Sequence, residues 1–247
     1  MMLGAIGPEA GQEPPSLADH LLNVAVLAVR IGYELLGEKD RLVGLALAAL
    51  VHDVGMCLLP VDLRSKPGPL GPDELELLRQ HPILTATLAE SWGGPLAPLV
   101  GILLQEHERE DGSGYPHDLV GKQISLEAKL LGLGDTYEAM THNRPYRAGR
   151  HPHDVMRDLL STAHHLFERR LLGALTRQIS LYPLGSVVEL NSREQGIVVG
   201  VNPSTPMRPY LLIISRRDVR SQVVPRLVNL IEEPILHIQR CVRPSER

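Results

Sequence analysis

Apolar positions recur at helical spacing along the first 180 residues of the chain. In the segment 16–36 they fall three or four residues apart, as on the buried face of an amphipathic helix, and Ser16 stands where an N-cap belongs. The segment 40–54, DRLVGLALAALVHDV, is apolar on nearly all sides, which predicts a helix buried inside the protein. Further helices are expected at 73–91, at 95–108, at 126–141 and between 152 and 180.

The pattern changes near residue 182, where short β-branched runs alternate with turn segments such as NSREQG and NPSTP. Four or five short strands are expected there. Charge divides at the same place, because residues 1–181 hold 16 Lys and Arg against 23 Asp and Glu, whereas residues 182–247 hold 9 against 6. The sequence predicts a mainly α protein with a flexible lead at 1–15, a helical domain at 16–181 and a small β-barrel-like domain at 182–247.

The composition limits the classes of ligand and location. Apolar residues make up 43% and charged residues 22%, as in soluble globular proteins, and no apolar run is expected to span a membrane. A net charge of −4 and only 3% aromatic residues argue against a nucleic-acid polymer as partner. Cys57 and Cys241 lie far apart, which favours a reducing cytoplasm, and Cys57 is expected to be buried behind its apolar helix.

The chemistry is expected from polar side chains that fall inside apolar helices. A buried imidazole or carboxylate needs a hydrogen-bonding partner or a metal ion. Taken singly, each such residue is more often a hydrogen-bonded core residue than a ligand. The set recurs on successive helices, however, and comprises His20, His52, Asp53, His81, Glu106, His107 and Asp135. Mixed imidazole and carboxylate ligands suit Fe, Mn or Zn, and a carboxylate with His on either side suits two ions about 3.5–4 Å apart.

The motifs HDVG, KPGPLGPDE, HP and EHEREDGSGYPHDLVGKQISLEAKLLGLGDTYEAMTHNRPYR resemble the HD-GYP family in order and spacing. The resemblance covers residues 16 to about 160 and implies an HD-superfamily helical bundle that hydrolyses cyclic di-GMP with two or three metal ions, often iron. It places His20, His52, Asp53, His81, His107 and Asp135 on metal-ligand positions, with His52 and Asp53 in the catalytic centre. The tail after residue 182 resembles the small β-domain of some relatives.

The resemblance also implies a substrate surface around the turn DGSGYP. Gly112 and Gly114 permit left-handed or strained backbone whose N–H groups can face an anion, and the Tyr115 ring could flank a purine. Arg144 and Arg147 are natural forked donors for phosphate oxygens, with Lys66 as a weaker candidate. The alternatives are a ligand-free turn and a solvated helix end.

Several positions depart from the family pattern. Met56 stands where the family usually has a phosphate-facing Lys, and Glu106 stands where it has the first of two consecutive His. Glu can still ligate Fe or Mn, but its charge weakens attraction for a phosphodiester. Ser16 occupies the position of the Glu that holds a third ion in some relatives, so two divalent ions are expected, Fe or Mn before Zn.

Three hypotheses follow from these observations. The first is a two-metal phosphodiesterase that hydrolyses cyclic di-GMP slowly, to a linear dinucleotide or to GMP. The second is a degenerate relative that binds metal, nucleotide and a protein partner of the diguanylate cyclase type without efficient hydrolysis. The third is an HD phosphohydrolase with another phosphoester substrate. An oligomer is compatible with all three.

Overall fold

The computed structural model describes residues 16–64, 66, 68–142, 149–179, 182, 184–202, 204–216 and 224–242. The helical part begins with α1 (Leu17–Leu36) and α2 (Lys39–Val51). Ser16 is the N-cap of α1, as predicted, because its hydroxyl accepts a hydrogen bond from the Asp19 N–H at 3.2 Å. Gly37, at φ 69°, ends that helix in the left-handed conformation that glycine adopts without strain.

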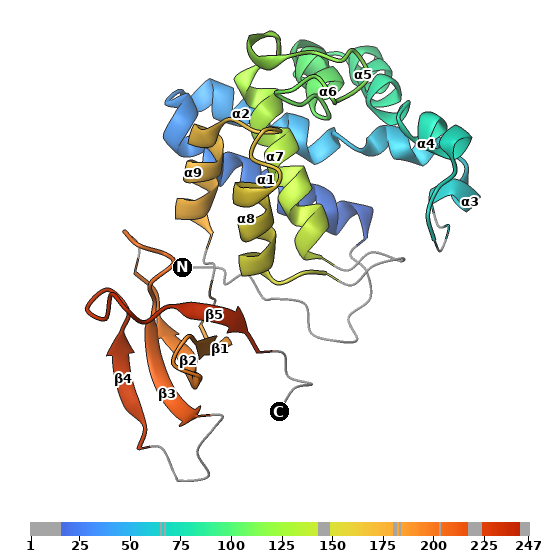
Figure 1. Ribbon diagram of the computed structural model, residues 1–247. Coiled ribbons are helices and arrows are strands. Elements are labelled where there is room, and N and C mark those ends of the chain that lie inside the picture. The colour runs from blue at the N-terminus through green and yellow to red at the C-terminus, as the bar shows by residue number, and fades with distance from the viewer. Residues whose placement is uncertain are drawn as a thin grey trace.

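Helix α7 (Leu126–Thr141) lies in the middle of the helical part (Figure 1). It packs against α1, α2, α6 and α8. Its apolar side chains join those of α1 and α2 in a core that includes Val24, Ile31, Leu45 and Leu130, all fully buried. The predicted all-helical class of this part is confirmed, and the central helix is the one that contains Asp135.

The remaining helices are short. They are η1 (Val54–Leu58), α3 (Val61–Arg64), α4 (Pro72–Leu78), α5 (His81–Trp92), η2 (Ala97–Leu99), α6 (Val100–Gln105), η3 (Gly121–Gln123), α8 (Pro152–Ser161) and α9 (Arg169–Gln178). The helix expected at 73–91 is therefore two helices, α4 and α5. The reason is Pro82, which has no N–H to donate to the Leu78 carbonyl one turn earlier.

The stretch Lys39–Leu58 corrects one expectation from the sequence. By length and composition it is apolar enough to cross a membrane, although no apolar run was expected to reach that length. In the structure it consists of α2 and η1, and α2 packs against α1 and α7. Its C-terminal half contains His52 and Asp53, which lie beside His20 of α1 and Asp135 of α7.

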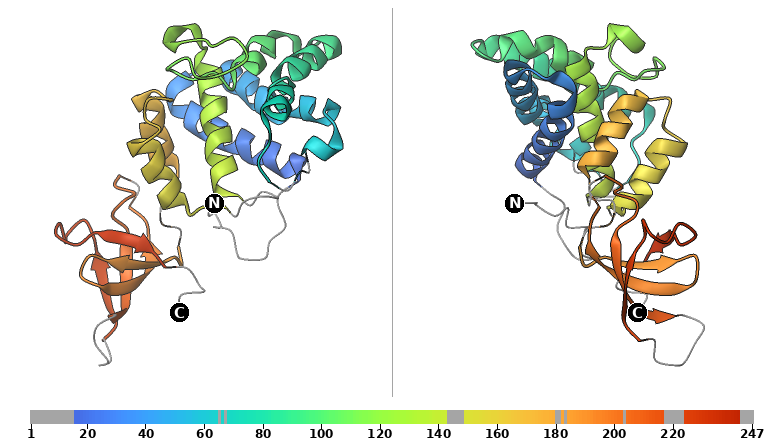
Figure 2. Two further views of the ribbon diagram at one scale, coloured as in Figure 1. Left: turned by 45° about the vertical axis from the view of Figure 1, so that its right-hand side comes forward. Right: turned by 90° about the vertical axis from the view of Figure 1, so that its left-hand side faces the viewer.

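The C-terminal part is a five-stranded antiparallel sheet in the order β4-β3-β2-β1-β5. Its strands are β1 (Val187–Leu190), β2 (Glu194–Gly200), β3 (Tyr210–Arg216), β4 (Arg226–Asn229) and β5 (Ile238–Cys241). The small β-rich domain predicted from the alternating runs is confirmed. The sheet lies beyond α8 and α9, on the side away from α3 to α6 (Figures 1 and 2).

Tyr182 links the two parts. Its ring is nearly fully buried and stacks on the His153 ring of α8 with centroids 5.1 Å apart. Buried residues of the sheet, such as Val188 and Leu211, belong to the same continuous core as those of α8 and α9. We propose the domain boundary near residue 181, with the two domains packed together; the predicted lead at 1–15 lies outside the described residues.

Candidate metal centre

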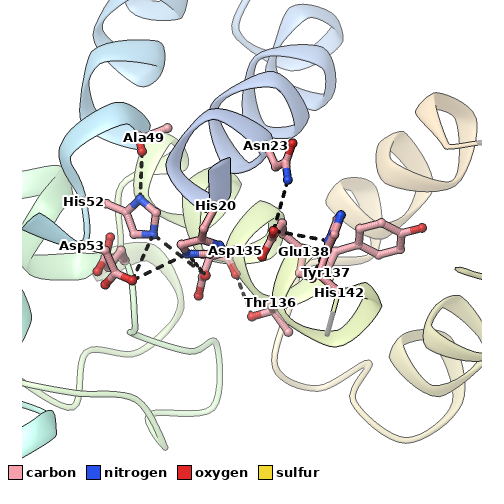
Figure 3. A network of polar contacts seen from close by, with 12 residues as sticks. His20, Asn23, Ala49, His52, Asp53, Asp135, Thr136, Tyr137, Glu138 and His142 are labelled. Atoms are coloured by element: carbon pink, nitrogen blue, oxygen red, sulfur yellow. Dashed lines mark hydrogen bonds and ion pairs between the residues drawn. The ribbon is translucent and has the colours of Figure 1, made fainter. Parts of the chain in front are cut away.

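The predicted ligands come from five helical segments and meet in two groups. Each group has its ligand atoms within 4.8 Å of one another. One group comprises Asp53, His81, Glu106 and His107, and the other comprises His20, His52 and Asp135. Helix ends supply most of them, because His52 is the C-cap of α2, His81 is the first residue of α5 and Glu106 is the C-cap of α6. His20 and Asp135 come from inside α1 and α7 (Figure 3).

Asp53 faces both groups at once. Its Oδ1 lies 3.2 Å from His81 Nε2, and its Oδ2 lies 3.6 Å from His20 Nε2. On the second group, Asp135 Oδ1 lies 3.4 Å from His20 Nε2 and 3.9 Å from His52 Nε2. A carboxylate with one oxygen toward each set of imidazoles matches the arrangement expected for a two-ion site.

Three of the histidines are held through their Nδ1 atoms. His52 Nδ1 lies 2.8 Å from the Ala49 carbonyl oxygen, and His81 Nδ1 lies 2.7 Å from the Leu78 carbonyl oxygen. The latter is the carbonyl that Pro82 leaves without a helical partner. His20 Nδ1 lies 2.6 Å from Glu138 Oε2. Since Nδ1–H donates to each acceptor, Nε2 of each ring points into the cluster as the atom available for a metal.

Buried atoms without hydrogen bonds show that the cluster fits a cation. Within the described part of the chain, His52 Nε2 and both carboxylate oxygens of Glu106 are buried and make no hydrogen bond. Glu106 Oε1 lies 3.1 Å from His107 Nε2 without the alignment of a hydrogen bond, and the Nε2 atoms of His81 and His107 face each other at 2.8 Å. The unpaired His52 Nε2 and Glu106 oxygens are costly to bury, and nitrogen and oxygen donors together suit a divalent transition metal.

The ionisation of the cluster points the same way. Burial lowers the pKa of His20, but Asp135, Asp53 and Glu138 outweigh it and raise that pKa to about 11. Burial likewise opposes charge on His81, yet Glu106 and Asp53 raise its pKa to about 9. The pKa of Asp53 lies far below its usual value, because the neighbouring histidines overcome the effect of burial. The carboxylates are therefore anionic and attract positive charge, from protons or from a metal.

Two glycines allow the ligand-bearing segments to approach one another. A Cβ on Gly55 would collide with the His81 carbonyl oxygen, and a Cβ on Gly132 would collide with that of Glu106. Thr85 stabilises the contact between Gly55 and α5. Its hydroxyl donates to the His52 carbonyl at 2.8 Å and accepts from the Gly55 N–H at 2.9 Å. The geometry of the cluster thus depends on the absence of a side chain at both glycines, where two backbone segments come into contact.

The DGSGYP turn packs directly against the cluster. Gly112 has φ 79°, as expected for a left-handed position. Gly114 does not, and glycine is needed there for another reason: a Cβ would collide with the backbone of His107 and Glu108. The Tyr115 ring stacks on His107 with centroids 4.7 Å apart and an interplanar angle of 15°. One ring face is therefore occupied by a candidate ligand.

Sequence reasoning missed the supports behind the ligands. Glu108 is buried, and its carboxylate accepts the N–H groups of His117 and Leu119 at 2.7 and 2.9 Å, which holds the turn in place. Arg109 donates to the carbonyl oxygens of Glu106 and Glu108 at 3.0 and 2.8 Å. The charged residues of EHERE could have suggested these supporting contacts. A run of charged residues usually faces solvent, however, so the sequence alone did not assign them.

The remaining residues singled out from the sequence are not seen at the cluster in the described part of the chain. Arg144 and Arg147 lie outside the described residues. Lys66 is bound to Glu74, with its Nζ 2.6 and 2.7 Å from the two carboxylate oxygens. The expectation that Cys57 is buried is wrong, because η1 turns its side chain outward and exposes it.

Comparisons with known proteins agree with this geometry. Residues 8–171 match the HD domain family, and residues 187–247 match the KOW domain associated with HD domain. The chain belongs to the HD domain family. A cyclic di-GMP phosphodiesterase of Pseudomonas aeruginosa is 32% identical over 85% of this chain and 51% of that protein. The cyclic di-GMP phosphodiesterase PdeB of Borreliella burgdorferi is 30% identical over 78% of this chain and 50% of that protein.

Other HD-domain proteins extend the comparison. The 3'3'-cGAMP-specific phosphodiesterase 3 of Vibrio cholerae is 28% identical over 72% of this chain and 39% of that protein. Among solved structures, an HDG"Y"P protein from Bdellovibrio bacteriovorus shares the fold with a TM-score of 0.53 and 20% identity, over 65% of this chain and 51% of that one. The predicted HD-GYP membership and fold class are confirmed. This chain spans about half the length of the two cyclic di-GMP phosphodiesterases named above.

Proposed function

We propose that the chain is a metal-dependent phosphodiesterase that hydrolyses cyclic di-GMP. The observation that carries the proposal is the convergence of seven predicted ligands into two adjoining groups, with Asp53 of the first group facing His20 of the second. Similarity to cyclic di-GMP phosphodiesterases over most of the chain supports this substrate.

In this proposal, Asp53, His81, Glu106 and His107 hold one divalent ion and His20, His52 and Asp135 hold a second. Iron or manganese suits the mixture of imidazole and carboxylate donors, and zinc is the third candidate. Bound ions would lower the pKa of water at the centre and offset charge on the phosphate oxygens.

The protein groups orient the site. Nδ1 contacts fix the rings of His20, His52 and His81, so that little reorganisation is needed when the substrate arrives. Arg144 and Arg147 are proposed to hold the phosphates, and the turn at Gly114 and Tyr115 is proposed to form the adjoining wall. Lys66 would have to leave Glu74 to join them.

Turnover is proposed to be slow. Glu106 adds a buried negative charge where the family has a neutral imidazole, and half-buried Met56 adds no cation where the family has Lys. Both differences disfavour a dianionic dinucleotide. At an effective dielectric near 20, one unit charge a few ångströms away is worth on the order of a few kcal/mol, and each 1.4 kcal/mol is about tenfold in rate.

A cytoplasmic location is proposed with this function, because both cysteines are free and the substrate class is a soluble nucleotide. A diguanylate cyclase would be a natural protein partner, since it makes the substrate. Neither proposal changes the chemistry of the site.

A panel of substrates tests the function. Metal-loaded protein is incubated with cyclic di-GMP, 3'3'-cGAMP and bis(p-nitrophenyl) phosphate, and the products are separated by chromatography. We expect cleavage of cyclic di-GMP that disappears in Asp53→Asn. Cleavage of the aryl diester alone would assign the chain to another phosphoester, and cleavage of 3'3'-cGAMP alone would change the nucleotide.

A further inference from the structure

Arg79 occupies an unusual place beside the candidate metal centre. It is the C-cap of α4, two residues before His81, and it is exposed. Its guanidinium carbon lies 5.3 Å from the centre of the Tyr115 ring. That ring in turn stacks on His107, so an arginine fork, a tyrosine ring and a candidate metal ligand follow one another from the surface inward.

Arg109 and Lys129, which lie beside this turn, are already engaged, and so is Lys66. The Nη1 of Arg109 donates to two carbonyl oxygens, and its Nη2 donates to the Thr136 hydroxyl at 3.3 Å. Lys66 is bound to Glu74, and Lys129 lies 2.6 Å from Glu110 and 2.5 Å from Glu168. Among the described residues, no carboxylate forms an ion pair with Arg79.

We propose that Arg79 contacts the nucleotide substrate and supplies the cation that Met56 does not. The inference rests on the proposed function, because it concerns the ligand of the same site. Stacking on Tyr115 orients the fork at little further entropy cost, and the exposed donors remain available for a ligand. The turn between α4 and α5 places the Arg79 backbone two residues before His81.

The chemistry that Arg79 recognises is a pair of adjacent acceptor atoms. A cyclic dinucleotide offers this pair in two places, on a phosphate group and on the O6 and N7 edge of guanine. Adenine presents N7 beside an amino donor, so it cannot accept two hydrogen bonds from the fork. The two sources are therefore distinguishable by changing the base.

The test is calorimetric binding of cyclic di-GMP and of cyclic di-AMP to metal-loaded protein, with products analysed in parallel. The variants are Arg79→Gln and Arg79→Lys. Arg157→Gln is the matched control, because Arg157 is also an exposed arginine but lies on α8 and pairs with Asp154 and Asp158. Metal content and far-ultraviolet circular dichroism confirm that each variant is folded and loaded.

We expect Arg79→Gln to weaken cyclic di-GMP binding about tenfold to hundredfold, as for the loss of a charged hydrogen-bonding group, and Arg157→Gln to change it less than twofold. If the Arg79 guanidinium binds phosphate, Arg79→Gln weakens the binding of cyclic di-AMP as much as that of cyclic di-GMP. Arg79→Lys then recovers much of the lost affinity. If the guanidinium binds guanine, Arg79→Gln weakens only the binding of cyclic di-GMP, and Arg79→Lys recovers little of the lost affinity.

Other outcomes separate the two proposals. Unchanged affinity in Arg79→Gln overturns the inference and leaves the proposed function standing if hydrolysis is observed. Binding without hydrolysis by the parent protein overturns the proposed function, while the affinity ratio still decides the role of Arg79. Failure of the parent to bind either nucleotide overturns both.

Discussion

Glu106 is the residue at which this chain differs most from the pattern it resembles. Its side chain is almost fully buried, and neither carboxylate oxygen has a hydrogen bond among the described residues. An ionised carboxylate in that state needs a cation. We expect Glu106→Ala to lose one of two metal ions, as measured by elemental analysis of anaerobic protein. Full metal content in that variant would show that Glu106 is not a ligand.

Charge at the same position is expected to limit turnover. The double change Met56→Lys with Glu106→His removes one anion and adds one cation on the proposed phosphate path. Cyclic di-GMP cleavage is expected to rise at least tenfold over the parent, by the charge argument above. Initial rates at saturating metal measure this. A parent enzyme as fast as the double variant would contradict the charge argument.

Glu138 acts on the cluster through His20. It is fully buried, and its carboxylate accepts from His20 Nδ1 and lies 3.3 Å from Asn23 Nδ2 and from His142 Nδ1 (Figure 3). Loss of such a partner typically lowers metal affinity about 10–100-fold. We expect that loss in Glu138→Gln, measured by competition with a chelating dye. Glu127→Gln, on the same helix but paired with Arg41, should leave the affinity unchanged.

Proton release on metal binding follows from the histidine pKa values. With pKa values of about 11 and about 9, His20 and His81 are protonated at pH 7 in the metal-free chain. Their Nε2 atoms must lose those protons to bind metal, so affinity should rise with pH through about 9 and on toward about 11, and fall toward acid. Calorimetry in buffers of different ionisation heats measures the release. No release at pH 7 would contradict the protonated state.

At the scale of helices, close backbone contacts at Gly55 and Gly132 position the ligands. Gly132→Ala should destabilise the protein by about 1–3 kcal/mol and lower metal content, because the new Cβ meets the Glu106 carbonyl. Gly101→Ala in α6 is the matched control, since nothing lies within 4 Å of its added Cβ. That variant should be neutral or more stable by up to about 1 kcal/mol. Equal effects in both helices would rule out the close backbone contact as the cause.

The sequence predicted the helical class because apolar periodicity is a local signal, and the seven candidate ligands, which stay a prediction, lie together in two groups. The split of 73–91 into α4 and α5 followed from Pro82 and could have been anticipated. The supports at Glu138 and Thr85 could not be assigned, since each depends on a contact between segments far apart in the chain. The exposure of Cys57 likewise depends on the turn that η1 makes after α2.

At the scale of the whole molecule, the sheet and the helices share one hydrophobic core, but all candidate metal ligands belong to the helical part. All seven candidate ligands precede residue 136, whereas Tyr182 stacks on His153 across the proposed boundary. A chain that ends at Gly185 keeps this stack and should retain metal, with a lower melting temperature from the exposed core. Metal loss after this truncation, measured by elemental analysis, would show that the sheet is needed to form the site.

The central claim is that paired metal groups make this chain a cyclic di-GMP phosphodiesterase. The most direct measurement is the rate of cyclic di-GMP cleavage, by product analysis, as metal-free protein is titrated anaerobically with iron or manganese. The account predicts slow cleavage that saturates near two ions per chain, by analogy with two-metal hydrolases, and that Asp53→Asn abolishes. Saturated metal binding without any cleavage of cyclic di-GMP would contradict it.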